Sequence, residues 1–250
     1  MLGVYDWLNV AAVAGVSLVF AYVAYRSLNV RSALAAPSYR KQALGVALLS
    51  TFAGLNILGS TVSGYLVYGG AAGALGNGAF GAFWVLLATL FYFVDSSVIA
   101  ARRTDPQARD TLHWSKLRLL LWVMVLPVAV LVTGIDIISA GVATGAPPGW
   151  SIFILVPGIL VPPVSGVIFL PLASRRAGDP AFKKHLRWFA VAALFFVLGQ
   201  VLGNPSNVAQ ALAITYIFDL AVAFALYKSV LSLVPVRSNA APFDSGLTDK

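Results

Sequence analysis

The sequence predicts an all-α fold, a polytopic integral membrane protein with seven transmembrane helices. Of its 250 residues, 59% are hydrophobic, only 10% are charged, and the mean hydropathy is +0.85. A soluble domain carries roughly 25% charged residues, so this composition excludes a soluble protein. Several apolar stretches also exceed the roughly 20 residues that a bilayer requires, and the basic residues are confined to short segments between them.

Hydrophobic runs that end at charged or turn residues define the seven helices. They span residues 5–25, 43–67, 79–101, 118–138, 150–172, 187–202 and 208–230. The stretch from Gln42 to Val94 has no charge for 53 positions, and as one helix it would be roughly 80 Å long, so the chain must turn. We expect this turn in the glycine-rich segment 69–78, and further neutral loops at 139–149 and 203–207.

The basic residues predict the orientation of the chain. All 17 fall between helices 1 and 2, 3 and 4, or 5 and 6, after helix 7, or at the adjoining ends of these helices, which places them on one side of the membrane. Short cytoplasmic loops hold positive charge, so we expect a multi-pass cell-membrane protein with its N-terminus outside and its C-terminus in the cytoplasm. No basic residue precedes the first apolar run, which favours a retained helix over a cleaved signal peptide. Residues 1–234 then form one transmembrane domain, and the polar segment 235–250 is a disordered cytoplasmic tail.

Three of the basic loops resemble one another. Each contains a proline (Pro37, Pro106 or Pro180) that is followed three residues later by a basic residue. This self-similarity predicts three parallel helical hairpins followed by a seventh helix. The alternative is that any basic loop before a helix has this composition. In two of the loops, Asp105 and Asp179 are suited to cap a helix that begins at the following proline.

The absence of certain residue types excludes several kinds of chemistry. The chain has no cysteine and no glutamate, and both histidines lie among basic residues. Disulfides, iron–sulfur clusters, thiol catalysis and a bis-histidine haem site are therefore not expected. Motifs of metalloproteases, serine hydrolases and phosphate-binding loops are missing as well. We therefore predict no enzyme activity, no catalytic residue, no metal site, no cofactor and no nucleic-acid partner.

Ionisable residues within the apolar stretches are the first candidates for a functional site, because a charge at the bilayer centre costs at least about 2.5 kcal/mol. Asp219 lies near the middle of the last predicted helix, beside Tyr216. We expect it to face the interior and to relay protons or hold a cation. The alternative is a protonated aspartate that bridges two helices. Asp95, near the basic end of the third helix, is another candidate, or else it pairs with a basic loop residue.

Uncharged polar residues and prolines extend this candidate site. Asn56 and Gln200 could complete a polar interior around Asp219, although such side chains also join helices by hydrogen bonds. The fifth predicted helix contains Pro157, Pro162 and Pro163. Each removes a backbone hydrogen bond, which predicts a discontinuity of the kind that forms binding sites in transporters, or else only a kink.

These observations favour a carrier or sensor of a small molecule or ion, with a polar site inside the membrane. The alternative is a non-catalytic accessory subunit of a larger membrane complex, and an intramembrane enzyme is least favoured. The expected partners are the lipid bilayer, a small-molecule or ion ligand, and membrane-protein partners. The first hypothesis requires Asp219, Asn56 and Gln200 to converge on one cavity, whereas the second requires a sealed interior.

Overall fold

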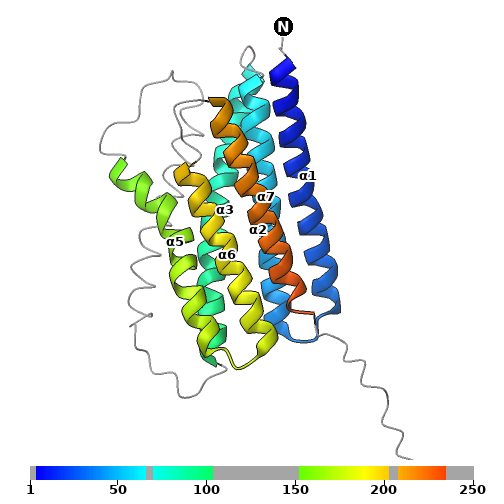
Figure 1. Ribbon diagram of the computed structural model, residues 1–250, viewed down its shortest axis with the longest axis vertical. Coiled ribbons are helices and arrows are strands. Elements are labelled where there is room, and N and C mark those ends of the chain that lie inside the picture. The colour runs from blue at the N-terminus through cyan, green and yellow to red at the C-terminus, as the bar shows by residue number, and fades with distance from the viewer. Residues whose placement is uncertain (1–3, 66–69, 104–151, 203–207, 235–250) are drawn as a thin grey trace, which may run out of the picture.

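A computed structural model describes residues 4–65, 70–103, 152–202 and 208–234. All regular structure in these ranges is helical. The six helices described are α1 (Val4–Ala33), α2 (Pro37–Tyr65), α3 (Gly70–Arg103), α5 (Ile152–Arg176), α6 (Pro180–Leu202) and α7 (Val208–Leu231). They form an elongated bundle (Figure 1). The predicted helix 118–138 and the predicted loops 139–149 and 203–207 lie outside the described residues, so seven helices remain a prediction.

The described helices pack as a ring. α1 contacts α2, α2 contacts α3, α3 contacts α5, α5 contacts α6, α6 contacts α7, and α7 returns to α1. α7 also contacts α2, so it lies against two helices from the first part of the chain. In Figure 1, α1, α3, α5 and α7 begin at the end marked N, and α2 and α6 begin at the opposite end.

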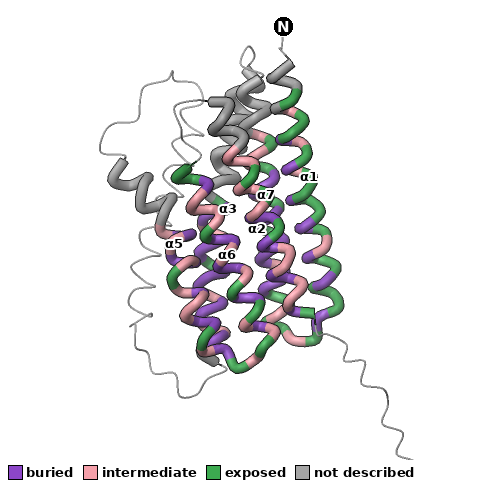
Figure 2. Tube along the Cα trace, in the orientation of Figure 1, coloured by how far each residue is buried: buried purple, intermediate pink, exposed green. Residues whose placement is uncertain are grey.

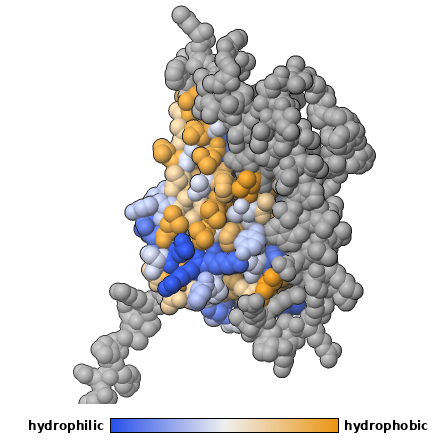
Figure 3. Space-filling view, turned by 180° about the vertical axis from the view of Figure 1, so that it is seen from behind, coloured by the Kyte–Doolittle hydropathy of each residue, from blue (hydrophilic) through white to orange (hydrophobic). Residues whose placement is uncertain are grey.

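The outer surface of the bundle suits a lipid environment. Four of the described helices are long and apolar enough to cross a membrane, over Val10–Ala33, Pro37–Gly59, Pro180–Leu202 and Ile214–Leu231. Leu18, Tyr25 and Ile217 are between 61% and 69% exposed although they are large and apolar. The face seen in Figure 3 is hydrophobic over most of its described length, with hydrophilic residues gathered toward one end. The helices therefore fit a multi-pass membrane protein.

Positive charge gathers at the end of the bundle where α2 and α6 begin, which we call the basic end. The described basic residues belong to the last turns of α1, α3, α5 and α7 and the first turns of α2 and α6. This is the one-sided distribution that the sequence predicted. Which side of the membrane holds the basic end stays a prediction.

The helix start predicted at Pro180 is confirmed. α6 begins at that residue, and the Ala181 N–H donates a hydrogen bond of 2.8 Å to Asp179 Oδ1. α2 likewise begins at a proline, Pro37. The internal repeat is not established by this likeness, and Asp105 and Pro106 lie outside the described residues.

The predicted turn at 69–78 was wrong, because α3 already begins at Gly70 and includes the rest of that glycine-rich segment. Three strong helix formers, Ala71, Ala72 and Ala74, alternate with the glycines. In a bilayer the backbone must also satisfy its own hydrogen bonds, which favours continuing the helix.

The expected discontinuity at Pro157, Pro162 and Pro163 is not seen either. α5 is one helix from Ile152 to Arg176, and its first turns lean away from the bundle axis (Figure 1). The Ser165 hydroxyl donates to the Pro162 carbonyl oxygen at 2.6 Å. α5 thus continues through its prolines as one helix, as membrane helices tolerate where neighbouring helices pack against them.

The helices approach closely where small residues face large ones. Buried residues follow the inner faces of the helices (Figure 2), and Phe20, Phe91 and Phe189 are among the largest fully buried side chains. A Cβ atom on Gly45 of α2 would overlap the Phe93 ring of α3. A Cβ atom on Gly166 of α5 would lie 2.8 Å from the Ala193 Cβ of α6. Because glycine has no Cβ atom, Gly45 lets α2 approach α3 closely, and Gly166 does the same for α5 and α6.

Candidate functional site

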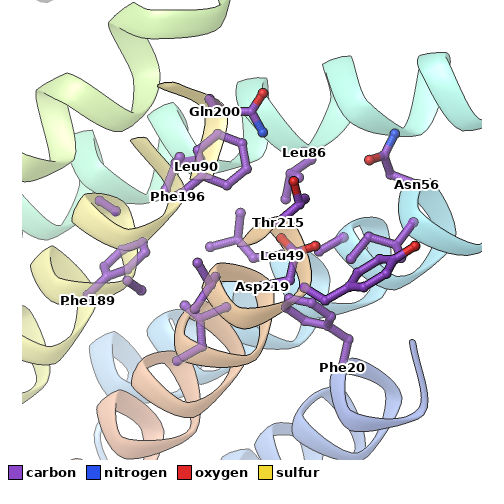
Figure 4. A pocket seen from close by; sticks show the side chains of 17 residues that line it. Phe20, Leu49, Asn56, Leu86, Leu90, Phe189, Phe196, Gln200, Thr215 and Asp219 are labelled. Atoms are coloured by element: carbon purple, nitrogen blue, oxygen red, sulfur yellow. The ribbon is translucent and has the colours of Figure 1, made fainter. Parts of the chain in front are cut away.

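A cavity of about 200 Å³ lies within the bundle, lined by residues of α1, α2, α3, α6 and α7 (Figure 4). The polar residues on its wall come from three helices, and they are Asn56, Gln200, Thr215, Tyr216 and Asp219. The aromatic and large aliphatic residues on its wall include Phe20, Leu49, Leu90, Phe189, Phe196 and Leu226. Four of the five residues proposed from the sequence for a polar site, Asp219, Tyr216, Asn56 and Gln200, therefore line one space.

The cavity has a polar part and an apolar part. α2 and α6 run away from the basic end, whereas α7 runs toward it. Asn56 lies two turns beyond Leu49 along α2, and Gln200 lies three turns beyond Phe189 along α6. On α7, Asp219 precedes Leu226. All three pairs place the polar residue farther from the basic end, so the part of the cavity nearer that end is lined by apolar side chains.

Asp219 is the ionisable residue of this cavity. It lies one turn after Thr215 on α7, and its side chain is half-buried on a cavity wall made mostly of apolar residues. Among the residues that the structure describes, none donates a hydrogen bond to the Asp219 carboxylate or pairs with it as a cation. A carboxylate in an apolar site without a donor is costly in its ionised form. A proton or a bound cation would remove that cost.

Asp95 does not belong to this cavity. It is buried on α3 and lines a second pocket of about 720 Å³ at the basic end, together with Lys41, Gln42 and Asp179. Gln42 crosses from α2 to α3, where its amide donates to Ser96 Oγ at 3.3 Å and its carbonyl oxygen accepts from Ser97 Oγ at 2.9 Å. Asp95 thus lies among basic and amide side chains, apart from Asp219.

Pro162 and Pro163 do not line the Asp219 cavity either, although both are buried in α5. α5 packs against α3 and α6, and it contributes no described residue to the cavity wall. The proline-rich helix α5 therefore packs against two of the helices that line the cavity, α3 and α6, without lining it with a described residue.

The aromatic wall of the cavity was not predicted from the sequence. Phe189, Phe196 and Gln200 recur along α6 at spacings of seven and four residues, which places them on one helical face. On α7, Thr215, Asp219 and Leu226 recur at spacings of four and seven residues, which also places them on one helical face. This periodicity could have identified the wall, but it was hidden because nearly all residues of both helices are apolar.

No group of three or more His, Asp or Glu side chains gathers as a metal site in the described part of the chain. Comparison of the chain with protein-family models, with curated proteins and with solved structures finds no match.

Proposed function

We propose that the protein is a membrane-embedded carrier or sensor of a small cationic molecule, with Asp219 as the counter-ion of the ligand. The observation that carries this proposal is the Asp219 carboxylate on the wall of a cavity, without a hydrogen-bond donor among the described residues. The N–H groups of a positively charged ligand would donate hydrogen bonds to the carboxylate. The positive charge would offset the cost of an ionised carboxylate in apolar surroundings.

The rest of the cavity suits such a ligand. Phe20, Phe189 and Phe196 offer aromatic rings, whose faces attract cations. Asn56 and Gln200 offer amide oxygens as acceptors for additional N–H groups. A volume of about 200 Å³ holds several water molecules or one small organic ligand. Small primary amines therefore match the cavity in charge, hydrogen bonding and size.

The polar part of the cavity lies away from the basic end, and by the predicted orientation this is the outer side of the membrane. We expect the ligand to enter from that side. The accessory-subunit hypothesis needs no cavity of this kind, and for that reason we rank it second. No catalytic role is proposed.

Calorimetric titration of the purified chain with n-butylammonium tests the proposal. We expect binding to the wild-type protein, and Asp219→Asn should weaken it at least 10-fold, because hydrogen bonds to charged groups contribute about 1.5–3 kcal/mol. Asp95→Asn is the matched control, since Asp95 is an aspartate of α3 outside this cavity. Equal affinity of Asp219→Asn and wild type would contradict the proposal, as would a larger effect of Asp95→Asn.

A further inference from the structure

A basic pocket of about 700 Å³ lies on the first turns of α6, separate from both pockets described above. It is lined by Pro180, Lys183, Lys184, Arg187, Trp188 and Val191. Lys184 and Arg187 are exposed, and Lys183 is half-buried. Three cationic side chains thus surround one space within two turns of a single helix.

No acidic residue from the described part of the chain lines this pocket. The nearest carboxylate in sequence, Asp179, lines the neighbouring pocket with Asp95, and its Oδ1 already accepts the Ala181 N–H. Among the residues that the structure describes, no carboxylate on the wall of the pocket neutralises the three positive charges. The pocket is electrostatically complementary to an anion.

An aromatic contact joins the pocket to α7. The Trp188 ring meets the Phe224 ring of α7 edge to face, with centroids 6.0 Å apart and an interplanar angle of 88°. Lys228 Nζ lies over the other ring of this pair, 5.5 Å from the Phe224 centroid. Tryptophan favours the boundary between headgroups and hydrocarbon. The cations of α6, and Lys228 of α7, thus gather at headgroup level.

Apolar surface continues from the pocket along the same face of α6. Trp188 and Val191 are the lining residues farthest along α6 from the basic end, and Leu194, one turn further, is 41% exposed. On α7, Phe224 and Leu220 are 53% and 42% exposed. A molecule that fills the pocket would therefore meet cations at one end and an apolar, lipid-facing surface at the other.

We propose that this pocket binds the phosphodiester headgroup of an anionic phospholipid, with its acyl chains along the exposed apolar face of α6 and α7. Lys183, Lys184 and Arg187 hold the phosphate, and Trp188 separates the headgroup from the chains. Basic pockets beside membrane helices are the usual sites of such lipids. This site does not depend on the Asp219 cavity or on its ligand.

Native mass spectrometry of the purified full-length protein, with added phosphatidylglycerol or phosphatidylcholine, tests this proposal. Wild type should bind phosphatidylglycerol in preference. Lys184→Gln combined with Arg187→Gln should weaken that binding roughly 30-fold, since each basic residue near an anionic surface contributes about a factor of five. The matched control is Arg31→Gln combined with Arg175→Gln, which removes two exposed charges of the same basic end. It should bind like wild type.

The other outcomes overturn the proposal. If both double variants weaken binding equally, the lipid responds to the overall charge and not to this pocket. If phosphatidylcholine binds as well as phosphatidylglycerol, the pocket does not recognise an anionic headgroup. If millimolar inorganic phosphate displaces phosphatidylglycerol from wild type, the pocket is a site for free phosphate and the lipid assignment is wrong. Thermal unfolding of all variants checks that their folds are intact.

Discussion

His185 of α6 and Ser229 of α7 are joined at the basic end of the bundle. His185 Nδ1 lies 2.7 Å from Ser229 Oγ and 3.1 Å from the Ser229 carbonyl oxygen. Both residues are fully buried. The imidazole stacks on the Phe182 ring at a centroid distance of 5.7 Å, and the Phe189 ring lies 6.0 Å away, tilted by 38°. This contact therefore connects the last turns of α7 to an aromatic cluster on α6.

Ser229→Ala tests the contribution of this contact to stability. The substitution removes the hydroxyl group but leaves the backbone carbonyl that also contacts His185. We expect the free energy of unfolding to fall by about 1 kcal/mol, the usual net contribution of one buried hydrogen bond. Chemical unfolding in detergent micelles measures this change.

Ser32→Ala is the control for this measurement, because the Ser32 hydroxyl is exposed and bonds only within α1, to the Asn29 carbonyl oxygen at 2.7 Å. We expect a change within about 0.5 kcal/mol, as for most surface substitutions. Equal effects of the two substitutions would show that the contact between α6 and α7 adds nothing to stability.

Gly45→Ala adds only one methyl group, but we expect it to destabilise the protein clearly. The added methyl group would overlap the Phe93 ring, so α2 and α3 would have to separate or the ring would have to leave its site. Overpacking of this kind costs about 1–3 kcal/mol. Thermal unfolding followed by far-ultraviolet circular dichroism measures the loss.

The matched control is Gly15→Ala on α1, where nothing lies within 4 Å of the added Cβ. Alanine is the better helix former by up to about 1 kcal/mol, so this variant should be as stable as wild type or more so. If Gly45→Ala were equally harmless, Gly45 would not determine how closely α2 and α3 approach.

Much of the fold follows from the sequence because hydrophobic length and charge are local properties. Apolar runs bounded by charge located all six described helices, and the pairing of Asp179 with Pro180 located the start of α6. At the basic end, however, the predicted helices were too short. α1 continues to Ala33 and α2 begins at Pro37, because a helix does not stop where its apolar run meets charge.

Other features depend on which helices become neighbours, and these are not local. Asp95 and Asp219 look alike in sequence, as single aspartates in apolar stretches. Only the packing of α3 against α2 places Asp95 with Lys41 and Gln42, and only the contact of α7 with α2 brings Asp219 and Asn56 to the same cavity. The cluster around His185 has the same origin, since its outermost ring, Tyr39, comes from α2 and stacks on Phe182 at 5.8 Å.

Asp179→Ala should destabilise the start of α6. The Asp179 carboxylate accepts the Ala181 N–H at 2.8 Å, and this N–H has no acceptor within the helix. Loss of such a cap costs about 1 kcal/mol. Asp179→Asn retains a side-chain oxygen at the same position and should cost only a few tenths of that. Hydrogen exchange of the Ala181 and Phe182 amides, with global unfolding, distinguishes the two variants, and equal protection in both would contradict the role of the cap.

Ala53→Leu tests whether the Asp219 cavity is open space available to a ligand. Ala53 is a buried cavity-lining residue of α2, so a larger side chain at this position extends into the cavity without changing any charge. We expect n-butylammonium binding to weaken at least 10-fold. The free energy of unfolding should stay within about 1 kcal/mol of wild type or rise, because filling a cavity restores packing contacts.

Ala12→Leu, on the exposed face of α1, is the control for added volume and should change neither binding nor stability. Two results would contradict the expectation for Ala53→Leu, and they have different meanings. A destabilisation like that of Gly45→Ala would show that the side chains around Ala53 already fill the space. Unchanged stability together with unchanged butylammonium binding would show that the amine binds elsewhere, and Asp219 would then have to be explained as a structural residue of α7.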